Sequence, residues 1–79
     1  GSIFRNPLPH HAGQLIEAVG LKGHSLGGAQ ISPMHGNFIV NSNQATAEDV
    51  LGLIQHAKDT VLAEKGIALQ TEVEIIGRK

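Results

Sequence analysis

Apolar residues recur with helical spacing in two stretches of the chain. In the first stretch they fall at i, i+3, i+4 and i+7 from Ala12 to Val19, which places them on one face of a helix. Gly20 follows directly, and glycine readily adopts the left-handed conformation that commonly ends a helix. The pattern therefore predicts a helix over residues 12–19.

The second stretch predicts a longer helix over residues 47–65, because its apolar residues form one continuous stripe. Thr46 and Asp49 have the spacing of a capping box, in which each side chain accepts a hydrogen bond from the backbone N–H of the other residue. Gly66 follows the last turn and marks the expected end of this helix.

Four further segments have the alternation or the apolar composition of strands. In residues 67–76 apolar and polar positions alternate, so that Leu69 and Glu72 fall on opposite faces. The consecutive apolar residues Phe38–Val40 indicate a strand that is covered on both faces. The glycine-rich residues 22–28 have no period and are predicted to form a loop. The four predicted strands are 3–4, 29–31, 37–41 and 67–76.

In chain order these elements read β-α-β-β-α-β. This order predicts an α+β fold with a small mixed sheet and two helices packed on one face. The 79 residues have the size of one domain, residues 1–79. Because Phe4 and Phe38 are the only aromatic residues and ten residues are glycine, the core must be small and aliphatic. Such a chain is expected to be one lobe of a larger protein.

Composition and charge exclude several classes of function. A formal net charge of −1 argues against nucleic acid or an anionic membrane surface as a partner. The absence of cysteine excludes disulfides, a thiolate nucleophile and cysteine-based zinc sites. No apolar run in the sequence approaches the roughly 20 residues of a membrane-spanning helix. A cytoplasmic location is therefore expected.

No single residue, taken alone, gives a strong indication of catalysis or of ligand binding. The five histidines lack the spacing of a zinc motif, so no metal site is predicted. Gly27 and Gly28 leave two interpretations open. Composition favours a tight strand entry with positive φ, and the alternative is a close backbone approach to a ligand or partner domain. Locally, Ser2 is typical of a turn and Glu72 of a solvated carboxylate.

Seven motifs in order along the chain change this picture. They are GSIFRNP (1–7), AGQLIE (12–17), GLKG (20–23), GGAQIS (27–32), HGNFIVN (35–41), ATAEDV (45–50) and EVEIIG (72–77). Together they resemble the C-terminal domain of the UDP-N-acetylenolpyruvoylglucosamine reductase (MurB) family, in the form that lacks a tyrosine-bearing loop. The resemblance covers essentially the whole chain.

The resemblance implies a flavoenzyme of peptidoglycan precursor synthesis. In that family NADPH reduces FAD, the flavin delivers hydride to the enolpyruvyl group of a UDP-sugar, and protonation yields UDP-N-acetylmuramate. The family's proton donor falls on Ser2, and its C-terminal catalytic glutamate falls on Glu72, where it would protonate or stabilise the intermediate. Asn6 and His35 fall at positions that contribute to the substrate pocket in relatives.

Two positions are left open by the resemblance. Arg5 either pairs with a phosphate or carboxylate of the substrate or is a surface cation. Glu74 stands where relatives commonly have arginine, which puts any ion pair of that arginine in doubt. The resemblance also implies that the FAD-binding domain lies outside these 79 residues. The fragment alone is then expected to be inactive and to hold neither FAD nor NADPH, and the missing domain is its expected partner.

Two other classes of function compete with this interpretation. One is a small non-catalytic α+β module whose glycine-rich loops bind a partner chain. The other is a metal-dependent site built from the five histidines. A flavin-binding domain encoded upstream favours the reductase, whereas stoichiometric metal in the purified chain favours the metal site.

Overall fold

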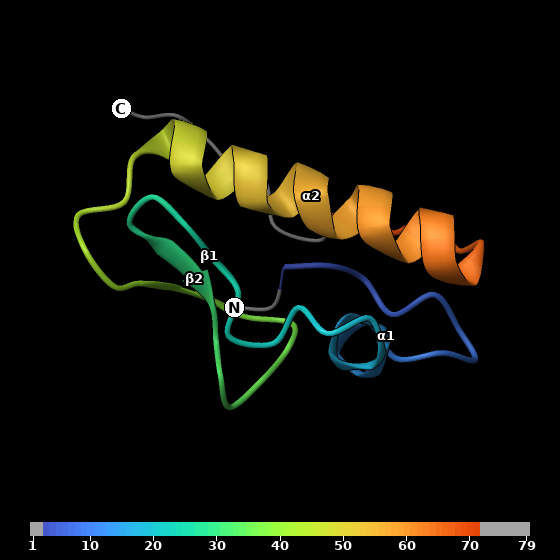
Figure 1. The fold of residues 1–79 in the computed structure, drawn as a ribbon. Coiled ribbons are helices and arrows are strands. Elements are labelled where there is room, and N and C mark those ends of the chain that lie inside the picture. Colours follow the sequence, from blue (N-terminus) through green and yellow to red (C-terminus); the bar gives the residue numbers. More distant parts are fainter. Residues whose placement is uncertain (1–2, 72–79) are drawn as a thin grey trace.

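The computed structural model describes residues 3–71, and it confirms the α+β class. Two helices and three strands follow one another along the chain in the order α1, β1, β2, β3, α2 (Figure 1). They are α1 (Ala12–Ala18), β1 (Ser25–Leu26), β2 (Ala29–Ile31), β3 (Ile39–Asn41) and α2 (Ala47–Lys65).

The boundaries of α2 are those predicted, and α1 ends one residue before the predicted residue 19. Thr46 Oγ1 accepts from the Asp49 N–H at 3.0 Å and Asp49 Oδ2 accepts from the Thr46 N–H at 3.1 Å, so the capping box of α2 is confirmed. Gly66 ends α2 with a φ of 70°, and Gly20 follows α1 with a φ of 80°. Residues close to the helix ends therefore mark where α2 begins and where both helices stop.

The sheet is antiparallel in the order β1-β2-β3, so the mixed sheet that was predicted is not found within residues 3–71. The prediction of a loop over residues 22–28 is wrong at Ser25–Leu26, which pair with Ala29 and Gln30 of β2. A strand of two residues is too short to display a period, so no pattern could have revealed it. Gly27, with a φ of 57°, provides the tight strand entry that composition favoured.

Within residues 3–71 one face of the sheet is covered and the other is not, so the prediction that Phe38–Val40 is covered on both faces is wrong. Ile39 pairs with the fully buried Ile31 and is itself half-buried. Phe38 and Val40 point to the opposite face and remain 41% and 39% exposed. The apolar run reflects a sheet that is covered by a helix on one side only.

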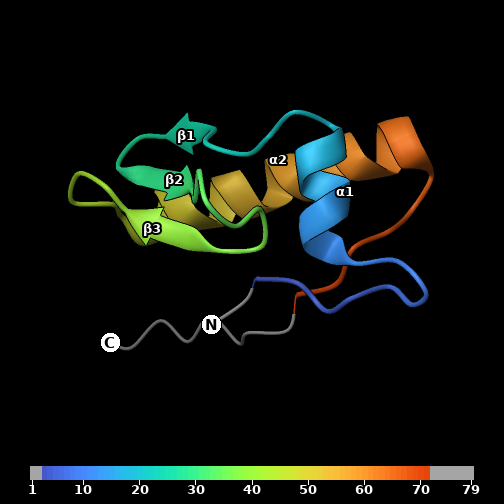
Figure 2. The same cartoon turned by 90° about the horizontal axis from the view of Figure 1, so that it is seen from below.

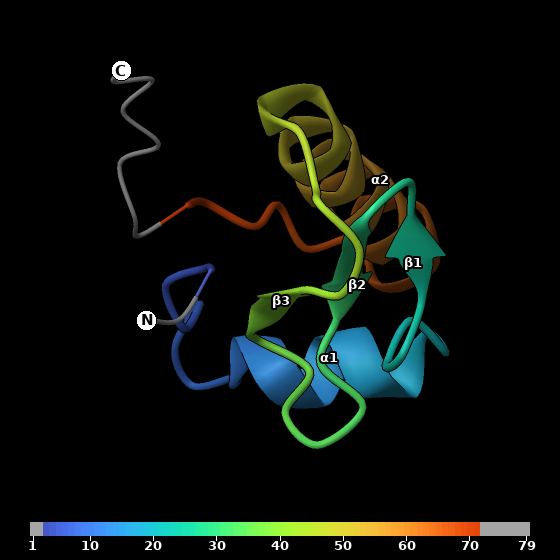
Figure 3. The ribbon, with the colours of Figure 1, turned by 90° about the vertical axis from the view of Figure 1, so that its left-hand side faces the viewer.

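The two helices do not share a face of the sheet. α2 packs along β1 and β2, whereas α1 lies beside the sheet and packs against α2 (Figure 2). Figure 3 shows α1 and α2 on different sides of the strands. The predicted packing of both helices on one face is therefore wrong for α1, whose apolar stripe faces the core cluster instead. That cluster contains Ile3, Phe4, Ala12, Leu15, Ile16, Leu21, Ala29, Ile31, Leu53, Ile54, Ala57, Val61 and Leu69.

The first and last described segments close the core. The predicted strands at 3–4 and 67–76 are reduced, within the described residues, to a single antiparallel bridge between Phe4 and Thr71. The predicted alternation holds before Thr71, because Leu69 is 2% exposed while Ala68 and Gln70 are exposed. Residues 72–76 of the predicted strand lie outside the described residues.

Candidate functional site

The segment that follows the predicted proton donor is hydrogen-bonded along both of its edges. On one edge, the Arg5 N–H donates to the Gln70 carbonyl at 2.9 Å, next to the Phe4–Thr71 bridge. On the other edge, the Ile3 N–H donates to the Asn37 carbonyl at 2.8 Å. The N-terminal segment thus lies between the C-terminal segment and the turn that precedes β3.

Asn37 adds a pair of side-chain hydrogen bonds to this edge. Its Oδ1 accepts from the Phe4 N–H at 2.9 Å, and its Nδ2 donates to the Phe4 carbonyl at 2.9 Å. Sequence analysis placed Asn37 in a strand and missed this contact. The two residues are 33 positions apart, so no local pattern could have paired them.

Asn6 was expected in the substrate pocket, but the oxygen of its side-chain amide already accepts a hydrogen bond within the domain. Its Oδ1 accepts from the Ala12 N–H, the first N–H of α1, at 2.9 Å. His11 occupies the N-cap position but makes no side-chain cap bond, so Asn6 supplies the missing acceptor from outside the helix. The Nδ2 group of Asn6 remains a donor in an exposed residue.

Arg5 and Asn6 line one hollow of about 250 Å³. Its other walls are Pro7, Ala68 and Gln70. The polar groups here are a guanidinium and two amides, and guanidinium and amide N–H groups bind phosphate or carboxylate oxygens rather than cations. The structure therefore brings two of the predicted substrate-binding residues together beside the C-terminal segment.

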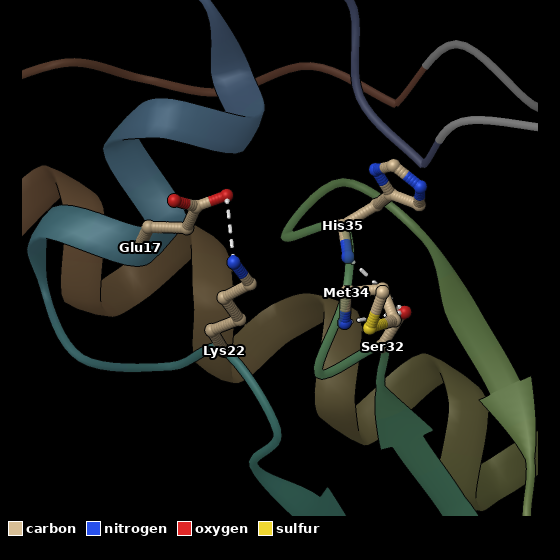
Figure 4. Close-up of polar contacts among 5 residues, drawn as sticks. All are labelled: Glu17, Lys22, Ser32, Met34 and His35. Carbon is tan, nitrogen blue, oxygen red and sulfur yellow. Dashed lines mark hydrogen bonds and ion pairs between the residues drawn. The ribbon is translucent and has the colours of Figure 1, made fainter.

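His35 does not line this hollow. Its exposed ring packs against Phe38 with a centroid separation of 5.5 Å and an interplanar angle of 49°. The turn beneath it is fixed by the buried Ser32, whose hydroxyl accepts from the N–H groups of Met34 at 3.1 Å and His35 at 3.2 Å (Figure 4). His35 is thus held on an ordered turn, apart from Arg5 and Asn6.

Ser2 and Glu72, the two predicted catalytic residues, lie outside the described residues. Their roles stay predictions. What the structure does describe is the pairing of Phe4, two residues after Ser2, with Thr71, the residue before Glu72.

Two carboxylates elsewhere in the domain, those of Glu17 and Asp49, are engaged with an ammonium group or with backbone N–H groups. Lys22 lies 3.6 Å from Glu17 at the end of α1, in an exposed ion pair of the kind that contributes little stability (Figure 4). Hydrogen bonds from the backbone N–H groups of Thr46 and Gly28 hold the pKa of Asp49 below its ordinary value of 3.8. Between residues 3 and 71, no three His, Asp or Glu side chains gather as metal ligands would.

The described residues do not fit a flavin. The hollow at Arg5 is smaller than the roughly 300–1,000 Å³ of typical small-molecule pockets. A second hollow, of about 510 Å³, lies between α1 and the end of α2 and includes His10, His11 and Lys65 in its lining. Neither hollow is lined by a glycine-rich loop that opens a helix, which is the usual cradle for a dinucleotide pyrophosphate. In addition, neither helix in the described part of the chain combines the length and the apolar character that a membrane span requires.

Comparisons with known proteins agree on one family. The family model described as UDP-N-acetylenolpyruvoylglucosamine reductase, C-terminal domain, matches residues 1–76. Reductases of that name are 65% identical over 79 residues in Anoxybacillus flavithermus and 64% identical over 77 residues in Bacillus subtilis. These alignments cover 100% and 98% of this chain but only 26% and 25% of the relatives.

A solved structure gives the same result. The crystal structure of UDP-N-acetylenolpyruvylglucosamine reductase (MurB) from Thermus caldophilus superimposes with a TM-score of 0.79 and 47% sequence identity. The match covers 94% of this chain and 26% of that one. The chain thus spans about a quarter of the length of its relatives, and it belongs to the family of UDP-N-acetylenolpyruvoylglucosamine reductases, as their C-terminal domain.

Proposed function

We propose that residues 1–79 act as one domain that forms the substrate side of a UDP-N-acetylmuramate dehydrogenase. The whole enzyme would use NADPH and FAD to reduce UDP-N-acetylenolpyruvoylglucosamine in peptidoglycan precursor synthesis, in the cytoplasm. FAD would be held by a separate part of the enzyme, since the described residues here do not fit a flavin, and when bound it would supply the hydride. The isolated domain is accordingly proposed to be inactive.

The observation that carries this proposal is the convergence of the two terminal segments. The Phe4–Thr71 bridge and the Arg5–Gln70 hydrogen bond join the segment that follows Ser2 to the segment that precedes Glu72. Residues far apart in sequence are thereby brought to one ladder. That is the arrangement a site needs when it draws one catalytic group from each end of the domain.

Two side chains at this ladder suit an anionic substrate. The Arg5 guanidinium is a permanent cation that pairs with phosphate or carboxylate through parallel N–H donors. Asn6 lines the same hollow, and its Nδ2 group is a donor that can bind a substrate oxygen. We assign to both the binding of an anionic group of the UDP-sugar. His35 is proposed to contact the substrate from a different direction, since it does not line this hollow.

The proposed chemistry of Ser2 and Glu72 is the protonation that follows hydride transfer. A serine hydroxyl is a poor acid in water, so it needs a strongly basic acceptor within about 2.6–3.2 Å. A substrate carbanion is such an acceptor. Glu72 would relay a proton or orient the intermediate, and exclusion of water on substrate binding would favour its protonated form.

The test uses the full-length reductase that contains this domain, studied by single-turnover kinetics. Ser2→Ala is expected to leave flavin reduction by NADPH intact and to slow flavin reoxidation by substrate by about 10²–10⁴-fold, the range typical of a positioned proton donor. Glu72→Gln is expected to have the same selectivity.

Two variants serve as matched controls, namely Ser25→Ala in the exposed strand β1 and Glu64→Gln on the exposed side of α2. Both are expected to reoxidise at the wild-type rate. Wild-type reoxidation in Ser2→Ala would remove Ser2 from the mechanism, and the same result for Glu72→Gln would return Glu72 to the solvent-exposed role that its local sequence indicates.

A further inference from the structure

We propose that Asn37 is a positioning residue for the reaction, acting through the backbone of Ile3 and Phe4. This inference rests on the proposed function, because the residues it would position are Ser2, Arg5 and Asn6. Asn37 itself touches neither Arg5 nor Asn6 through any hydrogen bond found in residues 3–71. Its hydrogen-bond partners are Ile3 and Phe4, which lie between Ser2 and Arg5 in the sequence.

The Asn37 side chain makes the two hydrogen bonds to the Phe4 backbone that a neighbouring strand would otherwise make. Phe4 offers one N–H and one carbonyl on the edge facing Asn37, and the carboxamide meets both, each at 2.9 Å. The Asn37 carbonyl accepts from the Ile3 N–H at 2.8 Å as a third bond. Only an amide side chain offers an acceptor and a donor with this spacing, since aspartate lacks the donor and leucine lacks both.

The backbone on both sides of Asn37 is held by a close contact and by a hydrogen bond. Gly36 is buried against α1 so closely that a Cβ there would lie 2.7 Å from the Gly13 carbonyl oxygen. On the other side of Asn37, the Phe38 carbonyl accepts from the Ser32 N–H at 2.8 Å. The position of the Phe4 backbone therefore depends, through Asn37, on the positions of α1 and of the sheet.

The two edges of the Ile3–Arg5 segment have different roles. The Gln70 edge ties the segment to the C-terminal segment, and the Asn37 edge ties it to the body of the domain. Without the Asn37 amide, Phe4 keeps its buried ring but loses the two bonds that fix its backbone. Displacement of a catalytic group by about 1 Å is enough to cost about 10²-fold in rate. The loss should therefore appear in the chemical step, in addition to any loss of stability from the unpaired Phe4 backbone groups.

The experiment compares Asn37→Ala and Asn37→Asp with the wild type in the full-length, flavin-loaded reductase. Flavin reduction by NADPH is expected to keep its wild-type rate. Reoxidation by saturating substrate is expected to slow by about 10-fold to 10²-fold in both variants. Asn37→Asp keeps the acceptor for the Phe4 N–H but places a carboxylate oxygen against the Phe4 carbonyl, so it should not restore the rate.

Asn41→Ala is the matched control, because Asn41, the last residue of β3, accepts a backbone bond through its Oδ1 from the Ala45 N–H at 2.9 Å and makes no hydrogen bond to Phe4 among the described residues. It is expected to lower the thermal midpoint without slowing reoxidation. If Asn37→Ala does not fold, Asn37→Asp carries the test, because it preserves the shape of the side chain.

The outcomes separate this inference from the proposed function. Slow reoxidation in Ser2→Ala together with wild-type reoxidation in both Asn37 variants overturns the positioning role and leaves the function intact. Wild-type reoxidation in Ser2→Ala overturns the function itself. A loss of flavin reduction equal to the loss of reoxidation in the Asn37 variants shows a general structural role and also overturns the inference.

Discussion

Gly28 shows how one residue without a side chain joins three parts of the domain. Its N–H donates to Asp49 Oδ2 at 3.1 Å, and its carbonyl accepts from the N–H groups of Ser42 at 2.9 Å and Asn43 at 3.1 Å. A Cβ at this position would overlap the Asn43 carbonyl oxygen and lie 2.6 Å from the Ala45 N. The close backbone approach that the sequence left open is therefore made to the protein's own chain.

Replacing Gly28 with alanine should destabilise the domain strongly. The new Cβ meets backbone atoms that cannot rotate away, so we expect Gly28→Ala to lower the free energy of unfolding by about 1–3 kcal/mol, as overpacking of a filled site does. Urea titration followed by circular dichroism measures the change. Gly13→Ala is the control, because a Cβ there meets only ordinary contacts at 3.6 Å inside α1, where alanine favours the helix. Equal stability in the two variants would contradict the close packing of Gly28.

At the scale of elements, Asp49 connects a helix terminus to a hairpin. One oxygen of its carboxylate accepts both from the Thr46 N–H within the capping box and from the Gly28 N–H at the entry of β2. The first of these bonds is the larger cause of its lowered pKa. A residue that the sequence identified as a local cap thus also fixes where the sheet meets α2.

This connection predicts a pH dependence of stability. A carboxyl group whose pKa is lower in the folded state stabilises that state above its unfolded pKa, and the contribution is lost as the pH falls through the folded pKa. We expect the urea midpoint of the wild type to fall below about pH 4 and that of Asp49→Asn to fall less steeply. Asp59→Asn removes the same charge from α2, retains Asp49 and should keep the wild-type dependence. An unchanged pH profile in Asp49→Asn would show that the two backbone bonds do not favour the charged carboxylate in the folded state.

The elements that were predictable from sequence are those whose signals are local. The helix caps at Thr46, Gly66 and Gly20 depend on residues within one turn, and all three are found. The two-residue strand at Ser25–Leu26 exists only through its pairing with β2, so it has no signature of its own. The family motifs pointed to Asn6 and left Arg5 open, whereas the contact between Asn37 and Phe4, which are 33 positions apart, required the structure.

At the scale of the whole molecule, stability depends on bringing the terminal segments into a small core. Phe4 is 1% exposed and packs in the same cluster as Leu69 and the apolar faces of α1 and α2. Phe38, the other aromatic residue of the chain, is 41% exposed. A chain of 79 residues has a total stability of about 4–12 kcal/mol, so one buried aromatic ring is a large part of it.

The two phenylalanines therefore make a matched pair of variants. Phe4→Ala removes a fully buried ring and should cost about 3–5 kcal/mol, a large part of that total. Phe38→Ala removes a ring of the same size from the uncovered face of the sheet and should cost about 1 kcal/mol or less. Thermal and urea unfolding of the 79-residue chain distinguish these values. Similar losses in the two variants would mean that the Ile3–Arg5 segment does not belong to the cooperative core, and the ladder it forms with Gln70 and Thr71 would then have to be held in place by the rest of the enzyme.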